Sequence, residues 1–534
     1  MASIIVKKDN QKVLMVNDCP FLMLAGEVHN SSSSTTEYME HVWKKAEELG
    51  LNSVLLPITW ELLEPEEGVF NFELVEGLIK QAREYEMKIG FLWFGAWKNA
   101  QCYYAPEWVK SDTKRFKRAQ VEKGKNFIRL KEFYNMSYTT LSYLCEATCD
   151  ADARAFRALM QRIKEVDEKE TTVVLVQVEN EMGVQGAARE YSDEADIMFE
   201  GPVPQDFISY LMENKNEMAA DIREEIEKGA KAGSWPEVFG AVAEEVFSAY
   251  HIAGYVEKVA LAGKEVYSLP LTVNCWLNKG DKPGVYPSGG PVARVMEVWQ
   301  YRAPSIDVYG ADIYARNFLE VCDEYKKRGN PLFIPETATH SHAGPRLLYT
   351  VGHYHAMGFA PFGFENMGKP FSATESYLFG VDTEDPAMNT PQDVSEYCWI
   401  NKTLHDMIPV LVEKYGTDDL KAAIKEKSKE ETLIFGDYGI RIVMESPVLT
   451  KTNGACLVLR TSENEFYMIA YGCCMAPFST NPGRPNIDIL ALEEGCFYNN
   501  KWKRIRRLNG DEVAITRYEK PTLLRLKLFA YPEN

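Results

Sequence analysis

Two glutamates stand after apolar runs, in positions where a carboxyl group could take part in a reaction. Glu181 closely follows the run VVLVQV at residues 173–178, and Glu336 directly follows LFIP at residues 332–335. A protonated carboxyl and an ionised one, about 5 to 5.5 Å apart, can cleave a glycosidic bond through a covalent intermediate. A lone glutamate at a strand end more often only meets solvent, so the hypothesis depends on the elements that carry the two residues.

Apolar runs with polar or aromatic ends recur along the first two thirds of the chain. Amphipathic stretches at residues 38–48, 72–85 and 150–168 separate some of them, and this alternation is typical of parallel β/α units. Eight units predict a closed (β/α)8 TIM barrel, in which the fourth and seventh strands, carrying Glu181 and Glu336, face each other across the mouth. The eight runs start at Phe21, Asn52, Lys88, Thr171, Leu269, Ile306, Pro331 and Gly358.

The carboxyl ends of barrel strands build the active site, so other polar strand ends are candidates to bind a substrate. Asn180, beside Glu181, suits a hydrogen bond to a sugar hydroxyl. Tyr314 ends the sixth strand and is expected to donate a hydrogen bond to Glu336 and hold it ionised. The other candidates are polar residues that end the first, third and eighth strands, namely Glu27, His29, Asn30, Lys98, Asn99 and Glu365.

Several of these positions have a second interpretation. Trp97 and Trp276 could stack on the face of a sugar ring or pack in the core. Lys98 could bind a hydroxyl or only neutralise nearby carboxylates. Glu27 could contact a sugar or help to cap the Ser/Thr-rich loop at residues 31–36.

Two histidine pairs, His340 with His342 and His353 with His355, raise the question of a metal site. No third ligand has a matching spacing, and a retaining glycosidase needs no metal. We therefore expect neither a metal nor another cofactor. A metal-dependent hydrolase is a further hypothesis, which full activity after exhaustive chelation would exclude.

The composition limits the partners. A net charge of -19 and a pI near 5.1 argue against nucleic acid or an anionic membrane and suit a small neutral carbohydrate. The first residues, MASIIVKKDNQKVLM, lack the apolar core of a signal peptide, and no run of about 18 apolar residues predicts a membrane span. The 11 cysteines show no paired metal spacing and are expected to be reduced. These features predict a cytoplasmic protein.

The chain is predicted to contain two domains, a catalytic barrel over residues 1–430 and an antiparallel β-sandwich over residues 431–534. A charged, helix-favouring insertion at about 187–240 follows the fourth strand and could form a lid, a wall or a solvated helix pair. The sandwich is expected to be structural, closing one side of the site or forming a homo-oligomer contact. Its predicted strands are residues 439–444, 456–460, 465–471, 487–493 and 522–529.

Four blocks of sequence follow one another along the chain: residues 50–79, residues 91–112, VQVENEMG at residues 176–183 and LFIPET at residues 332–337. In this order they resemble the family 35 β-galactosidases of clan A glycoside hydrolases. With the C-terminal region they cover almost the whole chain, and the resemblance is to the bacterial branch that carries a DUF5597-type β-sandwich. It implies that Glu181 is the acid/base and Glu336 the nucleophile.

The sequence departs from the family pattern at positions that are expected to recognise the sugar. Pro57 stands where the family carries Tyr, ELLEP at residues 61–65 replaces Asn-x-His-Glu-Pro, and WKN at residues 97–99 replaces the Cys-Ala-Glu that contacts galactose. The resemblance implies a retaining exo-β-glycosidase that removes terminal β-D-galactose from oligosaccharides or glycosides. A β-glucosidase, a β-fucosidase or an arabinopyranosidase of the same mechanism, and a non-catalytic sugar-binding barrel, are the alternatives.

Overall fold

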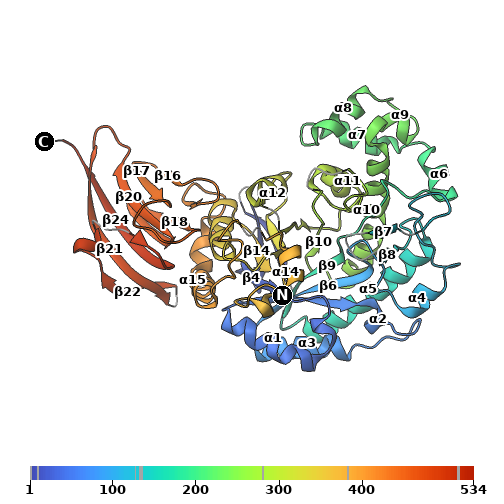
Figure 1. Ribbon diagram of the computed structural model, residues 1–534, viewed down its shortest axis with the longest axis horizontal. Helices are drawn as coiled ribbons and strands as arrows, with labels where there is room; N and C mark the ends of the chain where they lie inside the picture. The colour runs from blue at the N-terminus through green and yellow to red at the C-terminus, as the bar shows by residue number, and fades with distance from the viewer. Residues whose placement is uncertain are drawn as a thin grey trace. The chain divides into compact units, whose positions relative to one another are not determined.

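The computed structural model describes residues 3–8, 11–126, 128–130, 136–278, 282–314, 316–381, 384–498, 500–513 and 517–533. Each run predicted to be a barrel strand contributes strand structure, and the sixth contributes two short strands. Some of the barrel strands are labelled in Figure 1. The strands are β4 (Met23–Glu27), β5 (Ser53–Thr59), β6 (Lys88–Lys98), β9 (Val173–Asn180), β10 (Leu271–Val273), β11 (Val308–Tyr309), β12 (Asp312–Ile313), β13 (Phe333–Thr337) and β14 (Gly358–Pro361).

The order of this nine-stranded sheet is β11-β10-β9-β6-β5-β4-β14-β13-β12. Its pairs have parallel register, for example β6 with β9 and β13 with β14. Because β11 and β12 are two parts of the sixth predicted strand, interrupted at Gly310 and Ala311, one strand stands at both ends of the order. That order is the order of a closed barrel of eight units, and the predicted (β/α)8 fold is confirmed.

Amphipathic helices alternate with these strands as the sequence predicts. In α5 (Glu146–Asp167), for example, Phe156, Leu159, Met160 and Ile163 recur at helical spacing and are fully buried. The larger helices are α1 (Thr36–Glu48), α3 (Glu73–Glu84), α5 (Glu146–Asp167), α10 (Ala243–Lys264), α11 (Met296–Arg302), α12 (Phe318–Tyr325), α13 (Ala343–Tyr349) and α15 (Val394–Glu413). Smaller elements are β1 (Ile4–Lys8), β2 (Gln11–Val16), β3 (Cys19–Pro20), α2 (Trp60–Leu63), α4 (Glu107–Ser111), β7 (Ile128–Leu130), β8 (Met136–Tyr138) and α14 (Ala373–Leu378).

The chain divides into two compact units. The first comprises Met1–Ile4, Val28–Glu40 and Leu55–Asp312, and therefore contains β6, β9, β10 and β11. The second comprises Ile5–Glu27, His41–Val54 and Ile313–Asn534, and contains β4, β13, β14 and all the later elements.

The insertion after β9, in the first unit, is helical as predicted. Its helices are α6 (Asp193–Phe199), α7 (Gln205–Glu213), α8 (Ala220–Lys228) and α9 (Trp235–Phe239). The ring of Phe207 on α7 packs against Trp235 of α9 at 6.2 Å, Tyr250 of α10 at 4.9 Å and Tyr301 of α11 at 5.1 Å. This aromatic cluster fixes α7 and α9 onto the barrel helices, so the insertion is more than a solvated helix pair.

The C-terminal region forms two antiparallel sheets, with the orders β15-β18-β19-β24-β21-β22 and β16-β17-β20-β23. Alternate residues of both sheets fill one apolar core, which confirms the predicted sandwich. The sequence did not predict β15, β16, β20 and β23, and the boundary at residues 430/431 stays a prediction. The strands are β15 (Leu420–Ile424), β16 (Glu430–Phe435), β17 (Tyr438–Val443), β18 (Ala455–Ser462), β19 (Glu465–Tyr471), β20 (Cys473–Ser479), β21 (Asn486–Tyr498), β22 (Lys501–Arg507), β23 (Arg517–Tyr518) and β24 (Thr522–Tyr531).

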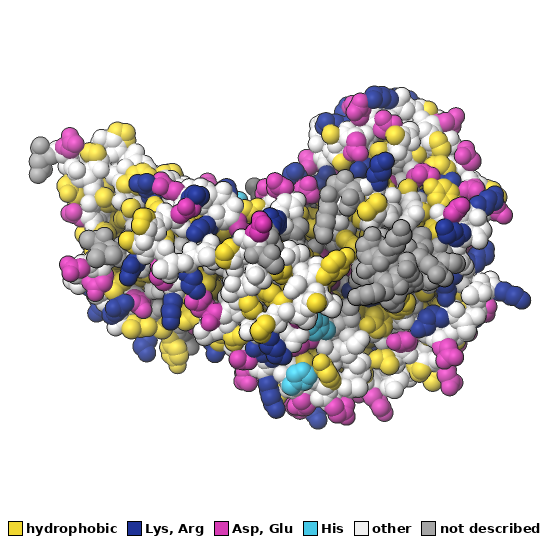
Figure 2. Space-filling model, viewed as in Figure 1, with side chains coloured by type: hydrophobic (Ala, Val, Ile, Leu, Met, Phe, Trp, Pro, Cys, Tyr) yellow, Lys and Arg dark blue, Asp and Glu magenta, His cyan; other side chains and the backbone are white. Residues whose placement is uncertain are grey.

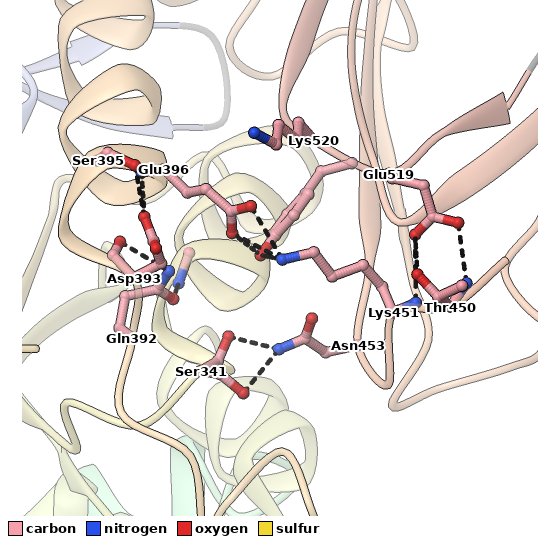
Figure 3. Close-up of polar contacts among 12 residues, drawn as sticks. Ser341, Gln392, Asp393, Ser395, Glu396, Thr450, Lys451, Asn453, Glu519 and Lys520 are labelled. Atoms are coloured by element: carbon pink, nitrogen blue, oxygen red, sulfur yellow. Dashed lines mark hydrogen bonds and ion pairs between the residues drawn. The ribbon is translucent and has the colours of Figure 1, made fainter. Parts of the chain in front are cut away.

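Within the second unit, the loop between β17 and β18 docks on barrel elements through polar contacts (Figure 3). Lys451 Nζ lies 2.9 Å from both carboxylate oxygens of Glu396 on α15, and the Tyr471 hydroxyl donates to the same carboxylate at 2.6 Å. Asn453 Nδ2 donates to the backbone oxygen of Ser341 at 2.6 Å. The sandwich is therefore attached to the barrel by charged and neutral hydrogen bonds.

Replacing Lys451 by methionine is expected to lower the free energy of unfolding by about 1.5–3 kcal/mol, because the carboxylate of Glu396 loses a charged hydrogen-bond partner. The side chain of Glu396 is only 11% exposed, so water replaces that partner poorly. Urea unfolding at neutral pH measures the change. Lys520→Met is the matched control, since Lys520 is exposed and makes no ion pair with the described residues. Equal losses in the two variants would contradict the expectation.

The surface carries both signs of charge. Figure 2 shows acidic and basic side chains intermixed over the described parts of the face in view. All eleven cysteines lie in described parts of the chain, and most of them are buried. No helix formed by the described residues is long and apolar enough to cross a membrane.

Candidate active site

In the first unit, the backbone around Glu181 is held by hydrogen bonds from two sides. Its N–H donates to Asn274 Oδ1 at 3.0 Å, and its carbonyl accepts from the N–H of Ala100 at 3.0 Å. Asn274 is oriented in turn, because its Nδ2 donates to Asp312 Oδ2 at 2.8 Å. Glu181 has a φ of 45° and is 8% exposed, so a buried carboxyl is presented on a fixed, left-handed turn of the chain.

Asn180, the residue before Glu181, has one bonded and one unbonded side-chain group. Its Oδ1 accepts from Lys98 Nζ at 2.8 Å, which aligns the ends of β6 and β9. Its Nδ2 is buried and has no hydrogen-bond partner among the described residues. Buried donors are nearly always paired in proteins, so this group is suited to a hydroxyl that comes from a ligand.

The two tryptophans lie in different environments. Trp97 is 1% exposed and packs edge-on against Tyr255, with ring centroids 4.7 Å apart, as in the core-packing interpretation. Its Nε1 is buried, again with no partner in the described part of the chain. Trp276 is half-buried just past β10, and Asn99 is half-buried with a φ of 53° just past β6.

In the second unit, the Tyr314 hydroxyl donates to Glu336 Oε2 at 2.6 Å, which confirms the hydrogen bond predicted between them. A length of 2.6 Å lies in the range of a hydroxyl bonded to a carboxylate. Glu336 is 4% exposed at the end of β13. The Tyr314 ring is stacked on Phe379 at 5.7 Å and meets the edge of Phe362 at 6.5 Å, so its position is fixed by packing.

Two further predicted residues, Glu27 and Glu365, are also buried in the second unit. Glu27 ends β4, and its carbonyl accepts from the N–H of Gly363 at 2.7 Å. Glu365 lies in the 3-10 turn η6 (Phe364–Asn366) that follows β14. The N–H of Phe362 donates to the carbonyl of Thr337 at 2.8 Å, so the ends of β13, β14 and β4 are joined by backbone hydrogen bonds.

Three of the four histidines that raised the metal hypothesis, His340, His342 and His355, are buried, and His353 is exposed. The rings of His340 and His342 lie 5.3 Å apart and nearly perpendicular, and burial lowers the pKa of both. His353 stacks on Tyr349 at 4.7 Å, and His355 stacks on Tyr415 at 5.0 Å. Within the described ranges, no three His, Cys, Asp or Glu side chains are grouped as metal ligands.

Two residues that support the strand end carrying Glu181 were not among the candidates predicted from the sequence. Asn274 is a polar residue at the end of the fifth predicted strand, and this position could have marked it as a candidate. Asp152 lies inside α5 and contacts the carboxylate of Glu179, and no pattern in the sequence distinguishes it from an ordinary helix residue.

Two stretches of the chain match the models of known families. Residues 13–121 match the model of glycosyl hydrolases family 35, and residues 401–518 match the domain of unknown function DUF5597. The chain is a family-35-like protein with a C-terminal DUF5597 domain. No curated protein matches it.

The solved structures that match the chain include glycosidases of distant sequence. A β-galactosidase from Bacillus circulans sp. alkalophilus is 13% identical with a TM-score of 0.46, over 73% of this chain and 57% of that one. An exo-β-1,4-mannosidase from Opitutaceae bacterium strain TAV5 is 12% identical with a TM-score of 0.44, over 76% of this chain and 63% of that one. This chain thus spans less than two thirds of the length of the β-galactosidase and of the mannosidase.

Proposed function

We propose that this family-35-like chain is a retaining exo-β-glycosidase in which Glu336 is the nucleophile and Glu181 the acid/base. The observation that carries the proposal is the 2.6 Å hydrogen bond from Tyr314 to Glu336. A hydroxyl that donates to a buried carboxylate stabilises its ionised form, which is the form that attacks an anomeric carbon. The buried position of Glu181 at the end of the fourth barrel strand supports its role as the second carboxyl.

The reaction follows from these roles. Glu181 protonates the glycosidic oxygen while Glu336 attacks the anomeric carbon, and the aglycone leaves from a covalent glycosyl-enzyme. Glu181, now ionised, takes a proton from water, which attacks the same carbon and releases the sugar with its original configuration. Asn180 Nδ2 is positioned beside Glu181 to donate to a hydroxyl of the sugar.

Terminal β-D-galactose is the sugar that we propose, because residues 13–121 match family 35 and the sequence resembles its β-galactosidases. Tyr314, Glu27 and Glu365 are proposed to contact this sugar together with Trp97, Lys98, Asn99 and Trp276. A small carbohydrate is therefore the proposed partner, and the cytoplasmic location and the homo-oligomer stay predictions.

A panel of nitrophenyl β-glycosides tests the function. We expect hydrolysis of the β-galactoside, or of the glucoside, fucoside or arabinopyranoside if the changed residues at 57, 61–65 and 97–99 have altered the specificity. Proton NMR of the first sugar released is expected to show the β-anomer, since a double displacement retains configuration. Release of the α-anomer would contradict the mechanism, and no turnover of any glycoside would leave the sugar-binding barrel as the better hypothesis.

A further inference from the structure

Two buried carboxyl groups lie close together next to the end of β9, the strand that precedes Glu181. Asp152 of α5 and Glu179 of β9, here called the carboxyl pair, are both fully buried. A Cβ added at Gly95 would lie 2.6 Å from Glu179 Oε1 and 2.7 Å from Asp152 Oδ1, so both oxygens surround one point beside β6. Each carboxyl group shifts the pKa of the other, so the two groups interact directly. Two carboxyl oxygens can hydrogen-bond to each other only through a proton that one of them carries.

The other partners show which carboxyl carries that proton. Both oxygens of Asp152 accept strong donors, Oδ1 from Trp93 Nε1 at 2.8 Å and Oδ2 from the Tyr255 hydroxyl at 2.9 Å. Glu179 Oε2 accepts from the N–H of Trp97 at 2.8 Å, but Oε1 receives only a long 3.3 Å contact from the N–H of Ala96. Glu179 Oε1 is therefore the oxygen best placed to be a hydroxyl that donates to an ionised Asp152.

The groups around the carboxyl pair do not offset a second negative charge. Tyr255 and Cys149 face it from α10 and α5, and burial raises the pKa of both. Lys258 of α10 pairs with Asp150 instead. In the part of the chain that the structure describes, neither carboxyl forms an ion pair. Burial and the charge of Asp152 raise the pKa of Glu179 well above its ordinary value.

We propose that the carboxyl pair shares one proton, held on Glu179, and that this hydrogen bond positions Asn180 and Glu181. Through Glu179 the pair binds the backbone of Ala96 and Trp97, so it ties the end of β6 to the end of β9. Glu179 has a φ of 61°, a strained conformation that its hydrogen bonds stabilise. The inference rests on the proposed function for its effect on catalysis, but the shared proton exists independently of any activity.

The protonation is tested first, without a substrate, by infrared difference spectroscopy of the wild type against Glu179→Gln at neutral pH. We expect the wild type to show one carboxylic-acid C=O band that the variant lacks, because glutamine donates an N–H in place of the shared proton. Glutamine gives up only the long contact to Ala96, so the fold is expected to remain. Identical spectra in the carboxylic-acid region would overturn the proposal.

The pH dependence of unfolding gives a second readout. A carboxyl whose pKa is raised on folding stabilises the fold fully below its unfolded pKa, and that stabilisation is lost as the pH rises through the folded pKa. The wild type is therefore expected to lose stability toward alkaline pH more steeply than Glu179→Gln. Parallel stability curves would contradict a proton on Glu179.

Activity then tests the positioning. Asp152→Ala leaves Trp93 Nε1, the Tyr255 hydroxyl and the proton of Glu179 without their acceptor, and we expect kcat/KM to fall roughly 10²-fold as Glu181 shifts. Glu179→Gln is expected to retain activity that Glu179→Ala loses, and its pH profile should extend further into the alkaline range. Equal losses in Glu179→Gln and Glu179→Ala would refute the positioning role. An inactive wild type would refute the proposed function and leave the infrared result standing.

Discussion

Replacing Glu336 by glutamine is expected to lower kcat/KM for the best nitrophenyl glycoside by roughly 10⁴- to 10⁶-fold, as loss of a nucleophile does in other hydrolases. The amide cannot attack the anomeric carbon. Its oxygen still accepts the hydrogen bond from Tyr314, which is 2.6 Å long in the wild type, so the fold is expected to be unchanged. Steady-state kinetics and a thermal unfolding curve measure the two effects separately.

Covalent labelling assigns the role of Glu336 directly. A 2-fluoro glycoside slows both the formation and the hydrolysis of the glycosyl-enzyme, so the covalent intermediate accumulates. Peptide mass analysis should find the label on Glu336 of the wild type and no label in Glu336→Gln. Glu365→Gln is the matched control, since it removes another buried carboxylate of the same unit and should still be labelled at Glu336. Label on Glu365 or Glu27 would contradict the assignment.

The barrel could be predicted from the sequence because its strands are buried on both faces and appear as uninterrupted apolar runs. All residues of β9 and β13, for example, are buried. The sixth strand was predicted as one run, but Gly310 and Ala311 interrupt it. The missed strand β16 alternates between exposed and buried residues, with Glu430 and Glu431 at its start, so its apolar signal is weak.

The positions of the candidate residues followed from strand ends, but their partners did not. The hydrogen bond from Tyr314 to Glu336 joins neighbouring strands and could be predicted from strand order. Asp152 reaches Glu179 from a helix, across a separation that local periodicity does not encode. Strict strand alternation would put Glu179 and Glu181 on the same side of β9. The positive φ values of both residues, 61° and 45°, end that alternation, which a sequence pattern does not reveal.

Replacing Glu181 by alanine is expected to lower kcat by about 10²- to 10⁴-fold, the usual contribution of a general acid/base. The loss should be greater for alkyl glycosides than for nitrophenyl glycosides. A nitrophenolate can leave without being protonated, whereas an alkyl leaving group needs a proton from the general acid. The hydrogen bonds that hold residue 181 involve its backbone and Asn274, so the substitution is expected to leave the strand end in place.

Azide separates the acid/base role from every other role of Glu181. In Glu181→Ala the glycosyl-enzyme still forms from an activated substrate, and azide fits the space of the missing carboxyl and needs no base to attack. We therefore expect azide to restore turnover and to yield the β-glycosyl azide, identified by NMR. An α-glycosyl azide would mean that residue 181 is the nucleophile and Glu336 the acid/base. Absence of rescue, with the same loss for alkyl and nitrophenyl substrates, would mean that Glu181 only supports the structure of the site.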